Sequence, residues 1–129
     1  VNAAGVHIGA NDGSIDDARN YLGHEALIGV SCYNSLELAQ AAEAGGADCI
    51  AFGSFYSSPT KPQAVSADIK LLQDAAKQIK IPVVAIGGIT PENGAALINA
   101  GADMLAVINA VFGQPDVCKA SRKFADLFN

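Results

Sequence analysis

The 129-residue chain is long enough to form one domain with a substantial core, and half of its residues are hydrophobic. The formal net charge of -5, without any cluster of lysine or arginine, argues against a nucleic-acid-binding protein. No apolar run is long enough to span a membrane, and no signal peptide is recognisable at the start. The odd number of cysteines and the lack of C-x-x-C spacing predict buried, reduced thiols in a cytoplasmic protein, at Cys32, Cys49 and Cys118.

Five strand–helix units follow one another along the chain. Short apolar runs predict strands over residues 5–8, 28–31, 49–53, 83–86 and 104–108. The helices that follow these strands are predicted over residues 14–22, 36–44, 67–78, 91–100 and 115–129. Ser14 and Asp17 resemble a capping box at the start of the first helix, and Thr90 followed by Pro91 resembles an N-cap at the start of the fourth.

An internal repeat links these units. The residues Ala-Gly-Gly-Ala-Asp, ending at Asp48, precede the third strand, and Ala-Gly-Ala-Asp, ending at Asp103, precedes the fifth. Repeated units of this size imply right-handed crossovers and a parallel sheet. The start of the chain resembles the tail of the same repeat, so we expect Val1 to lie at a helix-to-strand junction of a longer protein.

The turns after the last two strands predict a site for a phosphate group. Gly87-Gly88 lies between a strand and a helix, and such a turn leaves backbone N–H groups free and lets an anion come close. The next strand ends in Ile108-Asn109, again just before a helix, so the two turns can hold one phosphate between them. The alternative for the two glycines is a tight turn that only lets the helix pack.

Two architectures fit five parallel strands. An open, doubly wound sheet of the flavodoxin-like kind has the complete number of strands, but its signalling members need an acidic pair after the first strand and a Lys after the last. Only Asn11-Asp12 stands after the first strand here, and no Lys follows the last. An eight-stranded (β/α)8 TIM barrel, of which the chain holds about five carboxyl-terminal units, accounts for the phosphate site on the last two strands. We favour the barrel, with residues 1–129 as a single domain.

Further polar residues follow the other strands, at the edge where barrel enzymes keep their active sites. Asp12 is a candidate Mg²⁺ ligand, because Mg²⁺ takes one or two carboxylates together with water and substrate phosphates; the sequence alone favours an Asx turn with Gly13. Ser31 ends the second strand and is a candidate donor to a phosphate. His7 is interpreted as a packed, hydrogen-bonded residue rather than a catalytic one.

The loop after the third strand gathers three hydroxyl groups and one ammonium group, at Ser57, Ser58, Thr60 and Lys61. Hydroxyl groups and a lysine suit a phosphate or diphosphate, with the lysine acting as a point charge. The alternative is a solvated surface loop. This loop shares one face of the predicted sheet with Asp12, Ser31 and Gly88, which favours a phosphate-binding loop over a solvated surface loop.

Four blocks of sequence resemble the thiamine-phosphate synthase (thiamine-phosphate pyrophosphorylase) family, in the order of that family. They are GVHIG with Asp12, IGVS ending at Ser31, PTKP around Lys61, and VAIGGITPEN from Val84 to Asn93. The resemblance extends from end to end of the chain. It implies a part of an α/β barrel that joins hydroxymethylpyrimidine diphosphate to thiazole phosphate and releases diphosphate, with Mg²⁺ as the cofactor.

The resemblance also implies roles for individual residues. Asp12 would hold Mg²⁺, and Ser31 and Lys61 would act as catalytic residues on the diphosphate. The thiazole phosphate would be held by five residues, the last three through their backbone: Ser58, Thr60, Gly88, Ile108 and Asn109.

The chain departs from the family pattern in several places. The family usually has His where Tyr33 stands and Thr where Ser58 stands, and its first strands carry pyrimidine-binding and metal-binding residues that this chain lacks. We therefore expect an incomplete pyrimidine diphosphate half-site and little turnover, unless a missing N-terminal segment or a homo-oligomer completes the barrel. The alternatives are a thiazole tautomerase-like enzyme, which Thr60-Lys61 disfavours, and a non-catalytic, phosphate-binding half-barrel with open strand edges.

Overall fold

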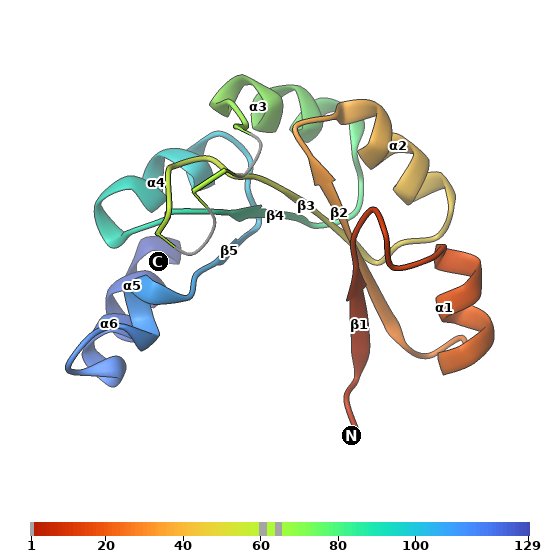
Figure 1. The fold of residues 1–129 in the computed structure, drawn as a ribbon. Helices are drawn as coiled ribbons and strands as arrows, with labels where there is room; N and C mark the ends of the chain where they lie inside the picture. The colour runs from red at the N-terminus through yellow and green to blue at the C-terminus, as the bar shows by residue number, and fades with distance from the viewer. Residues whose placement is uncertain (1, 60–61, 64–65) are drawn as a thin grey trace.

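The computed structural model describes residues 2–59, 62–63 and 66–129. Five parallel strands form one curved sheet in the order β1-β2-β3-β4-β5, which is also their order along the chain (Figure 1). The strands are β1 (Gly5–Ile8), β2 (Leu27–Tyr33), β3 (Cys49–Phe52), β4 (Val83–Ile86) and β5 (Met104–Ala106). Each predicted strand is thus confirmed, with small changes at its ends.

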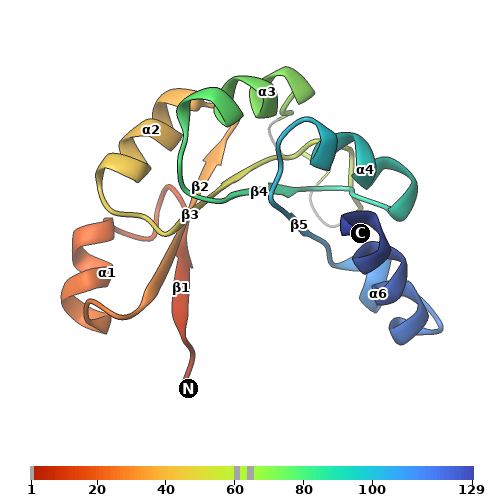
Figure 2. The same ribbon diagram turned by 180° about the vertical axis from the view of Figure 1, so that it is seen from behind.

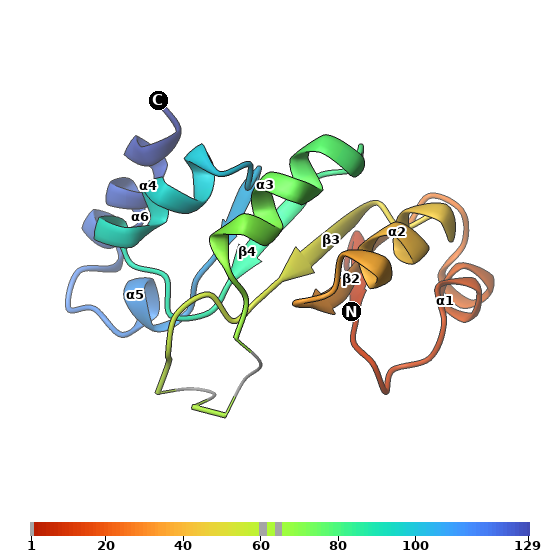
Figure 3. The same cartoon turned by 90° about the horizontal axis from the view of Figure 1, so that it is seen from above.

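The helices follow the strands in the predicted alternation. They are α1 (Ile15–Leu22), α2 (Leu36–Ala44), α3 (Ile69–Gln78), α4 (Pro91–Asn99), α5 (Asn109–Phe112) and α6 (Val117–Ala125), followed by the 3-10 helix η1 (Asp126–Phe128). Figures 1 and 2 show α1 to α4 along the convex side of the curved sheet, and Figure 3 shows these four helices succeeding one another across it, whereas the short α5 lies beyond the end of β5. In the described part of the chain, none of these helices has both the length and the apolar character needed to cross a membrane.

Several predicted boundaries differ from the structure. The second strand extends to Tyr33 rather than to residue 31, and the predicted last helix over residues 115–129 is α6 followed by η1. The third helix begins at Ile69 rather than at residue 67, because Asp68 is its N-cap and accepts the Lys70 N–H at 2.6 Å. The last strand ends at Ala106 rather than at residue 108, because its partner β4 ends at Ile86, before two glycines with positive φ. The short helix α5 therefore begins where the end of a strand was predicted.

The sequential strand order excludes the doubly wound alternative for the described residues. A doubly wound sheet reverses its strand order at a switch point and carries helices on both faces. Here every strand pairs with the next one along the chain, and the helices share one face (Figure 2). The chain is therefore an α/β protein built of consecutive, parallel strand–helix units.

Alternation of side chains divides the sheet into a face covered by helices and a concave face. Five side chains that point toward the helices are at most 3% exposed and form the core: Ile28, Ile50, Phe52, Val83 and Ala85. On the concave face, near the amino ends of their strands, Leu27 is 58% exposed and Met104 is 41% exposed. The core therefore lies between the sheet and the helices.

The internal repeat has the same structural role in both copies. Asp48 accepts the N–H of Ile28 at 2.8 Å and donates its own N–H to the Ile28 carbonyl at 2.8 Å. Asp103 makes the same pair of hydrogen bonds with Val83, at 2.8 Å and 2.9 Å. Each repeat thus ties the residue before a strand to the preceding strand of the sheet.

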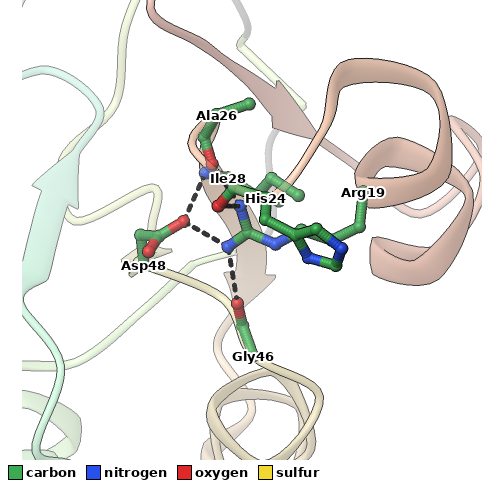
Figure 4. A network of polar contacts seen from close by, with 6 residues as sticks. All are labelled: Arg19, His24, Ala26, Ile28, Gly46 and Asp48. Carbon is green, nitrogen blue, oxygen red and sulfur yellow. Dashed lines mark hydrogen bonds and ion pairs between the residues drawn. The ribbon is translucent and has the colours of Figure 1, made fainter.

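The first copy of the repeat also contains an arginine network (Figure 4). The Arg19 guanidinium forms an ion pair with Asp48 at 2.7 Å and donates to the carbonyl groups of His24, Ala26 and Gly46. The Ile28 N–H and this guanidinium lower the pKa of the Asp48 carboxyl group. The network therefore fixes α1 against the amino ends of β2 and β3.

All three cysteines are free. Cys32 is buried, Cys49 is partly buried and Cys118 is exposed, so the prediction of buried thiols is wrong for Cys118. Cys118 lies near the start of α6, a helix whose buried residues are Ala120 and Phe124. The helix therefore has one buried side, and Cys118 lies outside it.

Candidate functional site

A cavity of about 1260 Å³ lies at the carboxyl ends of the strands. All five strands or the segments that follow them contribute to its lining. Six of the residues that the sequence predicted for the site line it together: Asp12, Ser31, Ser58, Gly88, Ile108 and Asn109. The structure therefore brings together every predicted site residue that it describes, whereas Thr60 and Lys61 lie outside the described residues.

The turn between β4 and α4 depends on glycine. Gly87 has a φ of 98° and Gly88 a φ of 60°, a region that side chains other than glycine rarely adopt. A Cβ atom on Gly88 would lie 2.5 Å from the Ser57 carbonyl oxygen and 2.7 Å from that of Tyr56. The absence of a side chain at Gly88 therefore lets the loop after β3 pack directly against this turn.

The helix after this turn begins as predicted. Thr90 is the N-cap of α4 and Pro91 is its first residue. The Asn93 side chain accepts the Thr90 N–H at 2.8 Å and donates to the Gly88 carbonyl at 3.2 Å. The Gly88 N–H takes no part in these bonds and has no acceptor among the described residues, and Gly88 lines the cavity.

The segment after β5 presents a second free N–H group to the cavity. Ile108 is the N-cap of α5 and accepts the N–H groups of Val111 and Phe112, at 3.2 Å and 2.8 Å. The Asn109 N–H belongs to the first turn of this helix and has no acceptor in the described part of the chain. The β4 and β5 turns thus present backbone donors to one cavity, as an anion site requires.

The β1–α1 loop is folded around Asp12. The Asp12 carboxylate accepts the Gly9 N–H at 2.8 Å, and the Asp12 N–H donates to the Gly9 carbonyl at 3.2 Å. The Ala10 N–H donates to the phenol oxygen of Tyr33 at 3.1 Å. The carboxylate therefore makes a local loop contact, but with Gly9 rather than with the predicted Gly13.

The prediction for His7 is confirmed in part. Its Nε2 atom lies 2.8 Å from the Ser31 hydroxyl, so the residue is hydrogen-bonded as predicted, but the ring lines the cavity rather than the core. Burial lowers the pKa of His7, and the nearby Asp12 carboxylate opposes this effect. The contact follows from the register, in which His7 pairs with Gly29, two residues before Ser31 on the same face, and no local sequence pattern signals it.

Glycine also makes room for this histidine. A Cβ atom on Gly29 would lie 2.5 Å from Nδ1 of His7 and 3.1 Å from Sγ of Cys49. The ring therefore lies over the bare backbone of β2. This position lets one imidazole reach Ser31, a predicted catalytic residue, from the neighbouring strand.

Two lysines of α6 were missed by the sequence interpretation. Lys119 and Lys123 line the cavity, on the side of α4 and α5. They are four residues apart and therefore share one face of their helix, which is a signal the sequence contained. The pKa of Glu92, which also lines the cavity, is lowered by hydrogen bonds with its own backbone and with Thr90, and to a smaller extent by Lys123.

The described residues fit a magnesium ion only in part. Among them there is no group of three or more His, Cys, Asp or Glu side chains that could hold a metal ion. Asp12 supplies one carboxylate in the β1–α1 loop. Because Mg²⁺ is usually held by one or two carboxylates, with water and substrate phosphates in the other positions, it fits here together with a phosphate-bearing ligand.

Comparison with known proteins gives consistent matches. A family model described as thiamine monophosphate synthase matches residues 1–111. A thiamine-phosphate synthase of Thiobacillus denitrificans is 56% identical over 126 residues, which cover 98% of this chain and 60% of the relative. A thiamine-phosphate synthase of Nitrosospira multiformis is 52% identical over 128 residues, which cover 99% of this chain and 55% of the relative.

A solved structure agrees with these sequence matches. The thiamine phosphate pyrophosphorylase from Pyrococcus furiosus superposes with a TM-score of 0.84 at 37% identity, over 97% of this chain and 59% of that one. The chain therefore spans 55% to 60% of the length of these relatives.

Proposed function

Because the chain belongs to the thiamine monophosphate synthase family, we propose that it acts in the cytoplasm as part of a thiamine-phosphate synthase. Its five units then belong to an eight-stranded barrel that condenses hydroxymethylpyrimidine diphosphate with thiazole phosphate. The observation that carries this proposal is the common cavity of Asp12, Ser31, Ser58, Gly88 and Asn109. The relatives named above are synthases, so the tautomerase-like alternative is not favoured.

The reaction breaks one bond and forms another. The bond between the pyrimidine methylene carbon and the diphosphate oxygen breaks, and the electron pair leaves with the diphosphate. The thiazole nitrogen then donates its pair to that carbon, and a carbon–nitrogen bond forms. Such a reaction needs stabilisation of the departing negative charge and exclusion of water, rather than a protein nucleophile.

The residues divide between the two substrates. The free N–H groups of Gly88 and Asn109, with the backbone of Ile108, bind the phosphate of thiazole phosphate, and Ser58 and Thr60 hold the same substrate. Ser31 and Lys61 contact the diphosphate. Since His7 lies 2.8 Å from the Ser31 hydroxyl, it fixes the direction of that hydroxyl.

Asp12 is the residue of this chain that would hold Mg²⁺. When bound, the ion neutralises charge on the diphosphate. Asp12 would provide one carboxylate, and Mg²⁺ usually takes its remaining ligands from water and phosphate oxygens. The Gly9 N–H donates to this carboxylate at 2.8 Å and so keeps it in place.

The proposal is tested by binding and by turnover. Calorimetry should show binding of thiazole phosphate and weaker, Mg²⁺-dependent binding of hydroxymethylpyrimidine diphosphate, because the second half-site is incomplete in this chain. Coupling assays with the chain alone should detect little thiamine phosphate. Asp12→Asn should weaken the Mg²⁺-dependent binding, whereas Asp16→Asn, an exposed change in α1 outside the cavity, should not. Binding of neither substrate would overturn the proposed function, and equal effects of the two variants would remove Asp12 from the metal site.

A further inference from the structure

The end of β2 has an irregular backbone. Ser31 pairs with Ala51, but Tyr33 pairs with Phe52, so Cys32 is an extra residue in the strand. Tyr33 has a φ of 55°, and among the described residues it is the one residue other than glycine with a positive φ. Bulges and unfavourable backbone conformations of this kind persist only where the surrounding structure holds them, and they are concentrated near functional sites.

The irregularity separates the environments of two neighbouring side chains. Cys32 is fully buried in the core, whereas Tyr33 lines the cavity. The Gly53 N–H donates to the Tyr33 carbonyl at 2.9 Å, which fixes this conformation against β3. The phenol of Tyr33 is therefore directed toward the neighbouring strand end on a rigid support.

The phenol contacts the loop that carries Asp12. Its oxygen accepts the Ala10 N–H at 3.1 Å, and a Cβ atom on Gly9 would lie 3.5 Å from it. The preceding N–H, that of Gly9, donates to the Asp12 carboxylate at 2.8 Å. Of two successive N–H groups in the loop, that of Gly9 thus holds the Asp12 carboxylate and that of Ala10 binds Tyr33 at the end of β2.

We propose that Tyr33 is a positioning residue, which holds the β1–α1 loop so that Asp12 faces a metal-bound diphosphate. This inference rests on the proposed function, because that function assigns the metal to Asp12. The inference assigns the end of β2, through Tyr33, a part in holding the loop that carries Asp12. The sequence offers no local sign of it, because the contact depends on the bulge.

The test uses the full chain and the probe magnesium with inorganic diphosphate. Tyr33→Phe removes the phenol oxygen and keeps the ring, and Tyr21→Phe is the matched control because the Tyr21 side chain is 90% exposed. NMR measures amide hydrogen exchange of Ala10 without ligand, and calorimetry measures the affinity for the probe. We expect Tyr33→Phe to speed exchange at Ala10 and to weaken binding roughly threefold to tenfold, as for loss of one hydrogen bond. Tyr21→Phe should change neither.

Each other outcome overturns the inference in an identifiable way. If Ala10 exchanges faster but affinity is unchanged, while Asp12→Asn abolishes binding, the positioning role fails and the proposed metal site stands. If affinity falls without any change at Ala10, Tyr33 acts on the ligand directly and not through the loop. If the unaltered chain does not bind the probe, or if Asp12→Asn binds it equally well, the proposed metal site fails and the inference fails with it.

Discussion

Replacement of Gly88 by alanine tests the packing of the β4–α4 turn. The added methyl group would lie 2.5 Å from the Ser57 carbonyl oxygen and 2.7 Å from that of Tyr56. Both contacts are with backbone, so neither can be relieved by a side-chain rotation. The loop after β3 must therefore move away from the turn, and its hydrogen bonds with β4 and the turn, such as the Tyr56 N–H to the Gly87 carbonyl at 3.1 Å, must weaken.

Two contributions add to the expected loss of stability. An alanine in the left-handed region costs about 1 to 2 kcal/mol, and displacing close-packed backbone costs about 1 to 3 kcal/mol more. Gly46→Ala isolates the first contribution, because Gly46 has a φ of 88° in the left-handed cap of α2 and no atom within 4 Å of the new methyl group. Gly88→Ala should thus lower the free energy of unfolding by about 1 to 3 kcal/mol more than Gly46→Ala.

Urea unfolding followed by circular dichroism gives this difference, provided that both variants keep the m-value of the unaltered chain. Calorimetry with thiazole phosphate provides a second measurement, and we expect Gly88→Ala to weaken binding while Gly46→Ala, outside the cavity, does not. Equal losses of stability in the two variants, within about 0.5 kcal/mol, would show that the turn and the loop are not in close contact. The steric argument for Gly88 would then be refuted.

Three further predictions concern the fold. Acidification below about pH 4 should lower the free energy of unfolding less in Asp48→Asn than in the unaltered chain. A carboxyl group whose pKa is lowered by folding stabilises the protein above its unfolded pKa, and this contribution is lost as the pH falls through its folded pKa. Identical dependence of the free energy of unfolding on pH in the two proteins would contradict the Asp48 network. A thiol reagent at pH 8 should modify exposed Cys118 first and buried Cys32 only after denaturation, because burial raises the pKa of Cys32 to about 11. Peptide mapping at successive times identifies which cysteine is modified first. Phe52→Ala should lower the free energy of unfolding by about 3 to 5 kcal/mol, whereas Phe112→Ala, at a side chain 73% exposed, should change it by less than about 0.5 kcal/mol; similar losses would contradict the assigned core.

The parts of the structure that depend on neighbouring residues could be predicted from the sequence. The capping box of Ser14 and Asp17 is confirmed, with the Asp17 N–H donating to the Ser14 hydroxyl at 3.0 Å, because cap residues are only three positions apart. The contact between His7 and Ser31 depends on the register of two strands, which no local pattern fixes. The conformation of Tyr33 depends on an extra residue in a strand, which apolar periodicity does not reveal. Local chemistry therefore predicted the elements and the edge of the sheet where the cavity lies, but not the contacts between strand ends.

The exposure of Leu27 and Met104 has a chemical consequence for the proposed reaction. A pyrimidine methylene cation that meets water becomes an alcohol, and one that meets the thiazole nitrogen becomes product. Both side chains lie on the concave face at the amino ends of their strands, and neither lines the cavity at the other end. In the eight-stranded barrel proposed above, this face would be the interior, so the ratio of alcohol to coupled product would report how well the remaining units exclude water from the cation, independently of how tightly either substrate is bound.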